Sequence, residues 1–307
     1  ANQSYAQAQH IFDRLQDALS GARMSVGWIH VLGELAEYEK ALTCARRAEA
    51  MLSASDSAED RRRLAALYGN WGIVCEQMQN FVEAVALYER RRQYFDTLPN
   101  KDMYLQLDEA ITLNDIGIIQ TLLGQYFEAE QAFLHALALL APYDSEPLIW
   151  VDLTRIQMNR AALAALSATR YETVHRLFQQ AQESRTRLPK EQQQRYFAIL
   201  DILEAGWLLH LGRWQEVDPA KLQQLEELTL ISGVALETDM ARLLLGQYEV
   251  MSGKTAQALA RFEQIENKPS SKSLGVVYFA CLWQARVLHQ VDQPLHAEAK
   301  LKQAIAL

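Results

Sequence analysis

Residues 124–137 read GQYFEAEQAFLHAL, and small and aromatic residues recur in this stretch at helical intervals. Tyr126 is followed by Ala129 after three residues, by Phe133 after seven and by Ala136 after ten. Positions three, seven and ten apart lie on one face of an α-helix, so the stretch predicts a helix with one packed side.

The pattern recurs along the whole chain. Eight positions, which we call anchors, are followed three residues later by Ala or Val, and six of the eight are aromatic. The anchors are Tyr5, Tyr38, Phe81, Tyr126, Tyr171, Trp214, Thr255 and Pro294. Successive anchors are 33, 43, 45, 45, 43, 41 and 39 residues apart. A helical period of this length predicts stacked helical hairpins.

Nine residues before most anchors stands a small residue, which allows two helices to cross closely. These residues are Gly72, Gly117, Ala162, Ala205, Gly246 and Ala285. We expect the large rings seven residues after the anchors, such as Phe133, to fill the space between repeats. Gly124, Gly212 and Gly253 fall where the first helix of a hairpin should end, which suits a left-handed backbone conformation.

The expected layout is one unpaired second helix at residues 2–19, followed by seven hairpins. The hairpins span residues 22–53, 62–97, 105–140, 148–187, 191–229, 233–267 and 274–306. The fifth hairpin matches the pattern least, because Pro219, Lys221 and Gln224 interrupt its second helix. We therefore expect a kink or an altered packing there.

On these residues the chain resembles the tetratricopeptide repeat (TPR) family, with the best matches at residues 113–142 and 68–94. The units are longer than the common repeat of about 34 residues, and are similar to those of bacterial regulatory TPR proteins. The resemblance implies an all-α fold, a right-handed superhelix (α-solenoid) of about seven hairpins plus an N-terminal orphan helix. We expect residues 1–307 to form a single TPR-like domain and to be a fragment of a longer multidomain protein, because both ends fall inside a repeat.

Composition excludes several classes of function. The net charge of −8 argues against nucleic acid or an anionic membrane as the main partner. Cys44, Cys75 and Cys281 show no metal-binding or disulfide spacing, so we expect free thiols in a cytoplasmic protein. No run of apolar residues is long enough to span a membrane.

Sequence motifs for catalysis are absent, since the chain has no phosphate-binding glycine loop, no HExxH and no GxSxG. We therefore predict a protein that is not an enzyme and has no cofactor and no metal site. Three arginine groups, at residues 46–47, 61–63 and 90–92, form either a basic patch for an acidic segment or ordinary surface charge.

In the TPR family the first helix of each hairpin lines a concave face. Counting back twelve residues from the anchors places Asn114 and Asn159 one above the other in consecutive repeats. Stacked amides can bind the backbone of an extended peptide, and Asn70, Asp115 and Arg160 would flank them. The alternative is that each asparagine only satisfies a neighbouring helix.

The C-terminal half has apolar residues twelve and fifteen residues before its anchors. They are Ile199, Ile202, Met240, Leu243, Phe279 and Leu282. Such a stripe is either packed core or a groove that awaits the apolar face of a partner. Of these residues we assign Ile202, Leu243 and Leu282 to the expected binding surface.

The resemblance implies a protein- or peptide-binding scaffold or sensor module within a larger bacterial signalling protein. Its partner would be a peptide or protein segment in the concave groove, and a covalently linked effector domain would lie outside this fragment. One alternative is a structural array that self-associates. Another is an enzyme with its active site in the cavity, for which only Asp115, Arg160 and His210 are candidates.

Overall fold

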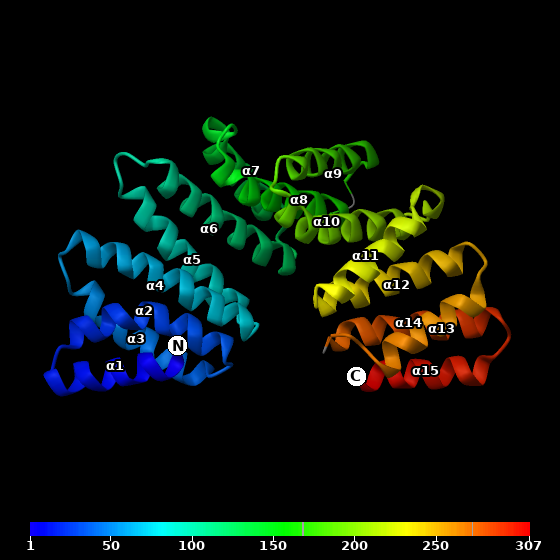
Figure 1. Ribbon diagram of the computed structural model, residues 1–307, viewed down its shortest axis with the longest axis horizontal. Coiled ribbons are helices and arrows are strands. Elements are labelled where there is room, and N and C mark those ends of the chain that lie inside the picture. The colour runs from blue at the N-terminus through cyan, green and yellow to red at the C-terminus, as the bar shows by residue number, and fades with distance from the viewer. Residues whose placement is uncertain (168, 272) are drawn as a thin grey trace. The chain divides into compact units, whose positions relative to one another are not determined.

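The computed structural model describes residues 1–167, 169–271 and 273–307. Within these residues the secondary structure is entirely helical (Figure 1). The chain divides into two compact units, residues 1–177 and 178–307, and the boundary falls inside helix α9.

The first unit holds three complete hairpins, preceded by a single helix and followed by the start of a fourth hairpin. Its helices are α1 (Asn2–Leu15), α2 (Ala18–Glu34), α3 (Tyr38–Ser53), α4 (Ala58–Gln77), α5 (Phe81–Asp96), α6 (Met103–Leu122), α7 (Tyr126–Leu140), α8 (Trp150–Leu166) and α9 (Tyr171–Thr186). Two 3₁₀ turns, η1 (Ala141–Tyr143) and η2 (Pro147–Ile149), connect α7 to α8.

The second unit contains the end of α9 and three further hairpins. Its elements are α10 (Lys190–His210), η3 (Trp214–Glu216), α11 (Pro219–Ile231), α12 (Ala235–Met251), α13 (Thr255–Asn267), α14 (Leu274–Gln290) and α15 (Pro294–Ala306). No helix in the described ranges is long and apolar enough to cross a membrane.

The predicted rhythm is confirmed at the starts of the second helices. Six of these helices begin at an anchor: Tyr38, Phe81, Tyr126, Tyr171, Thr255 and Pro294. The residue three positions after the anchor is buried in each of these six helices. An all-α array of helical hairpins therefore follows from the anchor spacing.

The first helix is shorter than predicted. It ends at Leu15 instead of residue 19, because Gln16 adopts a left-handed conformation with φ 57°. The side chain of Asp17 then accepts a hydrogen bond from the backbone N–H of Ser20 and caps α2. Residues 18 and 19 therefore belong to the first helix of the next hairpin.

The expected break in the fifth hairpin is confirmed. Trp214 begins a 3₁₀ turn, and α11 begins only at Pro219, with the Asp218 carboxylate as its cap. Leu222 and Leu225 are buried, one residue beyond the positions that carry the pattern elsewhere. The break therefore shifts the packed face of α11 by one residue.

Three glycines each face a large ring in the same hairpin. The pairs are Gly72–Tyr88, Gly117–Phe133 and Gly246–Phe262. A Cβ atom on Gly246 would lie 2.4 Å from Cε1 of Phe262, so no side chain fits there without movement. The prediction that the rings fill the space between repeats is confirmed for Phe262, which also stacks on Trp283 of the next hairpin, while each glycine leaves room for the ring inside its own hairpin.

Six junctions between the two helices of a hairpin share one geometry. The residue two positions before the anchor has a positive φ in each: Ala36, Gln79, Gly124, Gly212, Gly253 and Asp292. The next backbone N–H then donates to the carbonyl five residues earlier, for example from Asn80 to Cys75 at 2.8 Å and from Lys254 to Glu249 at 2.7 Å. The predicted left-handed ends at the three glycines are confirmed.

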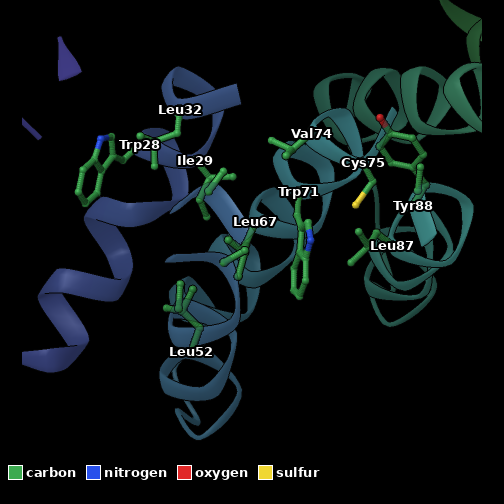
Figure 2. Packing of buried hydrophobic residues seen from close by; sticks show 14 of the residues in the cluster. Trp28, Ile29, Leu32, Leu52, Leu67, Trp71, Val74, Cys75, Leu87 and Tyr88 are labelled. Carbon is green, nitrogen blue, oxygen red and sulfur yellow. The ribbon is translucent and has the colours of Figure 1, made fainter. Parts of the chain in front are cut away.

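The core of the first unit lies between the hairpins. Figure 2 shows Trp28 and Leu32 of α2, Leu67 and Trp71 of α4, and Tyr88 of α5 within one buried cluster. In the second unit, Phe262 of α13 packs in a smaller cluster with residues of α12 and α14. The three cysteines are free thiols, as predicted.

Candidate peptide-binding surfaces

The two stacked asparagines bond to each other. The Nδ2 of Asn159, on α8, donates to the Oδ1 of Asn114, on α6, at 2.8 Å. Asn114 is fully buried, so its amide does not reach solvent, which differs from the predicted exposed ladder. Asn159 is half-buried, and a ligand on this wall would meet Asn159 first.

The flanking residues hold neighbouring helices together. Asn70 of α4 donates to the carbonyl of Val26 in α2 at 2.7 Å. Arg160 donates from both Nε and Nη2 to one carboxylate oxygen of Glu130 in α7, at 2.9 and 2.7 Å. Asn70 and Arg160 therefore both bond to a neighbouring helix from the helix face on which the sequence places them.

Asp115 lies beside this pair on α6. Burial raises the pKa of its carboxyl group to about 6, against the opposing effects of Arg155, the Asn114 amide and Arg91. The Asn114 Nδ2 donates to it at 3.3 Å. Asp115 is half-buried, and a carboxylate that is partly removed from water with weak compensation is a cost to folding at neutral pH.

We expect Asp115→Asn to raise the free energy of unfolding at pH 7 by about 3 kcal/mol, the equivalent of the rise in the pKa of this carboxyl group from its ordinary value to about 6. Because the folded-state pKa is raised, the folded protein binds more protons between about pH 4 and pH 6, and wild-type stability falls as pH rises through that window. The variant lacks this fall, so its advantage should be small at pH 4 and complete at pH 7. Urea unfolding at both pH values measures the difference.

Asp108→Asn is the matched control on the same helix. Asp108 is 53% exposed and pairs with Arg91 at 2.8 Å, so its replacement should change stability by less than about 1 kcal/mol. An equal advantage of Asp115→Asn at pH 4 and pH 7 would show that the Asp115 carboxyl is not the source of the pH dependence.

The second unit contains an apolar groove of about 620 Å³ lined by α10, α12 and α14. Met240, Leu243 and Phe279, which the sequence predicts for this face, all line it. Phe279 is 50% exposed and Met240 is half-buried, while Leu243 is buried, so the stripe is open to solvent mainly at Phe279. A cleft of this size with apolar walls is typical of a ligand site.

Two of the predicted lining residues lie elsewhere. Ile202 is buried in the core, and Leu282 is half-buried away from the groove, while the neighbouring Trp283 lines it. The prediction missed Gly206, Gln247 and Arg286, which also line the groove. These three stand eight residues before successive anchors, a position at which the residue type changes from repeat to repeat.

A buried carboxylate binds the segment that precedes α14, the helix that forms one wall of the groove. Asp239 of α12 is fully buried and accepts hydrogen bonds from the backbone N–H groups of Ser270 and Ser271, at 2.9 and 2.7 Å. Arg242 donates to the Ser270 hydroxyl at 2.8 Å and to Glu226 of α11 at 2.7 Å. These contacts tie α11, α12 and the segment before α14 together next to the groove.

The arginine groups of the first unit are largely engaged in ion pairs. Arg47, Arg63, Arg90, Arg91 and Arg92 each lie within 3.2 Å of a carboxylate. Ordinary surface charge accounts for these contacts. In the described residues, no group of three His, Cys, Asp or Glu side chains is placed to hold a metal ion.

No protein-family model and no curated protein matches this sequence. Solved structures match it along most of its length. The crystal structure of aspartyl phosphate phosphatase F from Bacillus subtilis has a TM-score of 0.67 at 13% identity, covering 95% of this chain and 73% of that one. The apo form of RapI has a TM-score of 0.65 at 12% identity, covering 98% and 91%.

A third match is the Rap conjugation gene regulator of the plasmid pLS20 in complex with the Phr* peptide. Its TM-score is 0.58 at 15% identity, covering 94% of this chain and 74% of that one. At these identities the likeness shows the fold, a TPR-like helical repeat.

Proposed function

We propose that this chain is a non-enzymatic module that binds a peptide or protein segment, and that it is the sensor or scaffold part of a larger bacterial regulatory protein of the long-unit TPR type. The observation that carries the proposal is the open apolar groove on the first helices of the second unit. A structural neighbour solved with a peptide supports the same reading. The effector domain that would respond belongs, in this proposal, to another part of the polypeptide.

The groove can supply both affinity and specificity. Burial of apolar side chains against Leu243, Phe279 and Trp283 provides the main driving force. Gln247 offers a donor and an acceptor for the peptide backbone. In the first unit, the half-buried Asn159 and Asn70 present amides on the corresponding helix face, and we propose them as further contacts.

A non-enzymatic role fits the chemistry of the groove, although one structural neighbour is named a phosphatase. The described residues that line the groove include no acidic side chain and no cysteine. General acid–base or nucleophilic catalysis combines a histidine, carboxylate or cysteine with a second catalytic group within hydrogen-bond reach, and among the described lining residues His210 is the one side chain of these three kinds. Binding is therefore the function that this surface supports best.

Affinity selection from a synthetic pool of random hexapeptides with free termini tests the proposal. The protein is incubated with the pool, separated by gel filtration, and the retained peptides are identified by mass spectrometry. We expect wild type to retain a subset of peptides and Phe279→Glu to retain at least ten-fold less of it, because a buried carboxylate opposes apolar contacts.

Leu295→Glu is the control, because Leu295 is 79% exposed on α15, outside the groove. It should retain the same peptides as wild type. Retention of no peptide by wild type, or equal retention by wild type and Phe279→Glu, would contradict the proposed function. Circular dichroism spectra of both variants should match that of wild type.

A further inference from the structure

The ionisable side chains that line the groove in the second unit are all basic. Its ionisable lining side chains, among the described residues, are Arg286 of α14 and His210 of α10, and none is acidic. An apolar groove that carries a cation and no anion favours a ligand that is apolar and negatively charged.

Arg286 differs from other arginines of the second unit. Arg185, Arg242 and Arg261 each lie within 3.1 Å of a carboxylate. In the part of the chain that the structure describes, Arg286 has no acidic partner, and its guanidinium lies 4.7 Å from the centre of the Trp283 ring. Stacking on an aromatic ring holds a guanidinium in place and leaves its N–H groups available to a carboxylate.

The Trp283 ring is itself held in place by a second aromatic ring. It stacks on Phe262, which is fully buried, with ring centres 6.4 Å apart. Arg286 is therefore oriented by a half-buried ring that packs against the core, so less conformational freedom is lost when a carboxylate binds.

The position of Gln247 favours a peptide over a simple acyl chain. Gln247 and Arg286 stand eight residues before their anchors in consecutive repeats, so they occupy equivalent sites on neighbouring helices. The Gln247 amide has no hydrogen-bond partner within the described residues, and it lines the groove. An amide that lines an apolar groove suits the N–H and C=O groups of a backbone, which an acyl chain lacks.

We propose that the groove binds the C-terminal end of a peptide whose last residues are apolar, with the free α-carboxylate held by Arg286. Neighbouring helices pack roughly 10 Å apart and an extended chain advances about 3.4 Å per residue, so Gln247 meets the backbone about three residues before the terminus. The apolar side chains of those residues lie against Phe279 and Leu243. This inference rests on the proposed peptide-binding function and specifies which end of the peptide is recognised.

The test compares one fluorescein-labelled hexapeptide, Gly-Ser-Ala-Leu-Phe-Leu, as a free acid and as a C-terminal amide, by fluorescence anisotropy with the complete chain. We expect the free acid to bind at least ten-fold tighter than the amide, because a charge-assisted bidentate contact is lost in the amide. Arg286→Gln should lower the affinity for the free acid to that for the amide and leave the amide unchanged.

Lys302→Gln is the matched control for loss of a positive charge, since Lys302 is 75% exposed on α15, outside the groove. It should preserve the ratio between acid and amide. Equal affinities for the two peptides in wild type, or an unchanged ratio in Arg286→Gln, would overturn the inference.

These outcomes separate the inference from the proposed function. If acid and amide bind equally and Phe279→Glu abolishes both, peptide binding stands and C-terminal recognition fails. If neither peptide binds while decanoate binds in an Arg286-dependent manner, the occupant is an acyl chain and the peptide inference is overturned. Failure of both probes and of the random pool contradicts the proposed function itself.

Discussion

Gly246→Val is expected to lower the free energy of unfolding by about 3 kcal/mol. A Cβ atom on Gly246 would lie 2.4 Å from Cε1 and 2.7 Å from Cζ of Phe262, and the two methyl groups of valine need still more room. Phe262 is fully buried, so its ring can move only by displacing other core side chains. Chemical denaturation followed by circular dichroism measures the loss.

Two further variants separate overpacking from a general effect of helix glycines. A Cβ atom on Gly206 of α10 would meet only Leu244, at an ordinary distance of 3.6 Å, so Gly206→Ala should stabilise by about 0.5–1 kcal/mol. Adding Phe262→Leu to Gly246→Val should recover part of the lost stability, although Phe262→Leu alone destabilises. Strictly additive losses in that double variant would show that the glycine and the ring do not compete for space.

Asp239→Ala is expected to destabilise the protein by about 3 kcal/mol. The substitution leaves the backbone N–H groups of Ser270 and Ser271 without their acceptor. It also removes the carboxylate that lies 3.4 Å from the buried guanidinium of Arg242. Thermal and urea unfolding of the two proteins at pH 7 provide the comparison.

Asp239→Asn distinguishes lost hydrogen bonds from lost volume. Its remaining carbonyl oxygen still accepts one backbone N–H, so the loss should be about half of that for alanine. A loss below about 1 kcal/mol for Asp239→Ala would mean that water replaces the carboxylate at the start of α14.

The repeat and the ends of the helices follow from the sequence because small and aromatic residues meet within each hairpin. Tyr126 marks the first residue of α7, and Phe133 faces Gly117 across the same hairpin. These contacts depend on residues a fixed distance apart in the chain, so a spacing pattern is sufficient to find them. Spacing predicts a large ring between repeats, as in the stack of Phe262 on Trp283, but it does not predict that the same ring also lies beside a glycine of its own hairpin.

The surfaces were less predictable, because exposure depends on contacts between repeats. Asn114 and Asn159 occupy the same register, yet only Asn159 reaches solvent, since the Asn159 side chain itself bonds to Asn114. Arg286 could not be predicted from the pattern, because the equivalent positions hold Gly206 and Gln247, which have neither its charge nor its size. A position that holds a different type of residue in every repeat shows no recurring pattern in the sequence, although its side chains line the groove.

The left-handed turn shared by the six junctions would allow one hairpin to replace another at the same junction. Ala36, Gln79 and Asp292 adopt the same left-handed turn as the glycines, so the pairing of the helices sets this bend and the side chain at the turn does not. Segments joined at equivalent junctions would enter their new neighbours with the backbone already in the right direction. Recombination at these junctions, between genes for related repeat proteins, would therefore combine new inner-face residues with an unchanged backbone. Related arrays could diverge in this way in the ligands that they recognise.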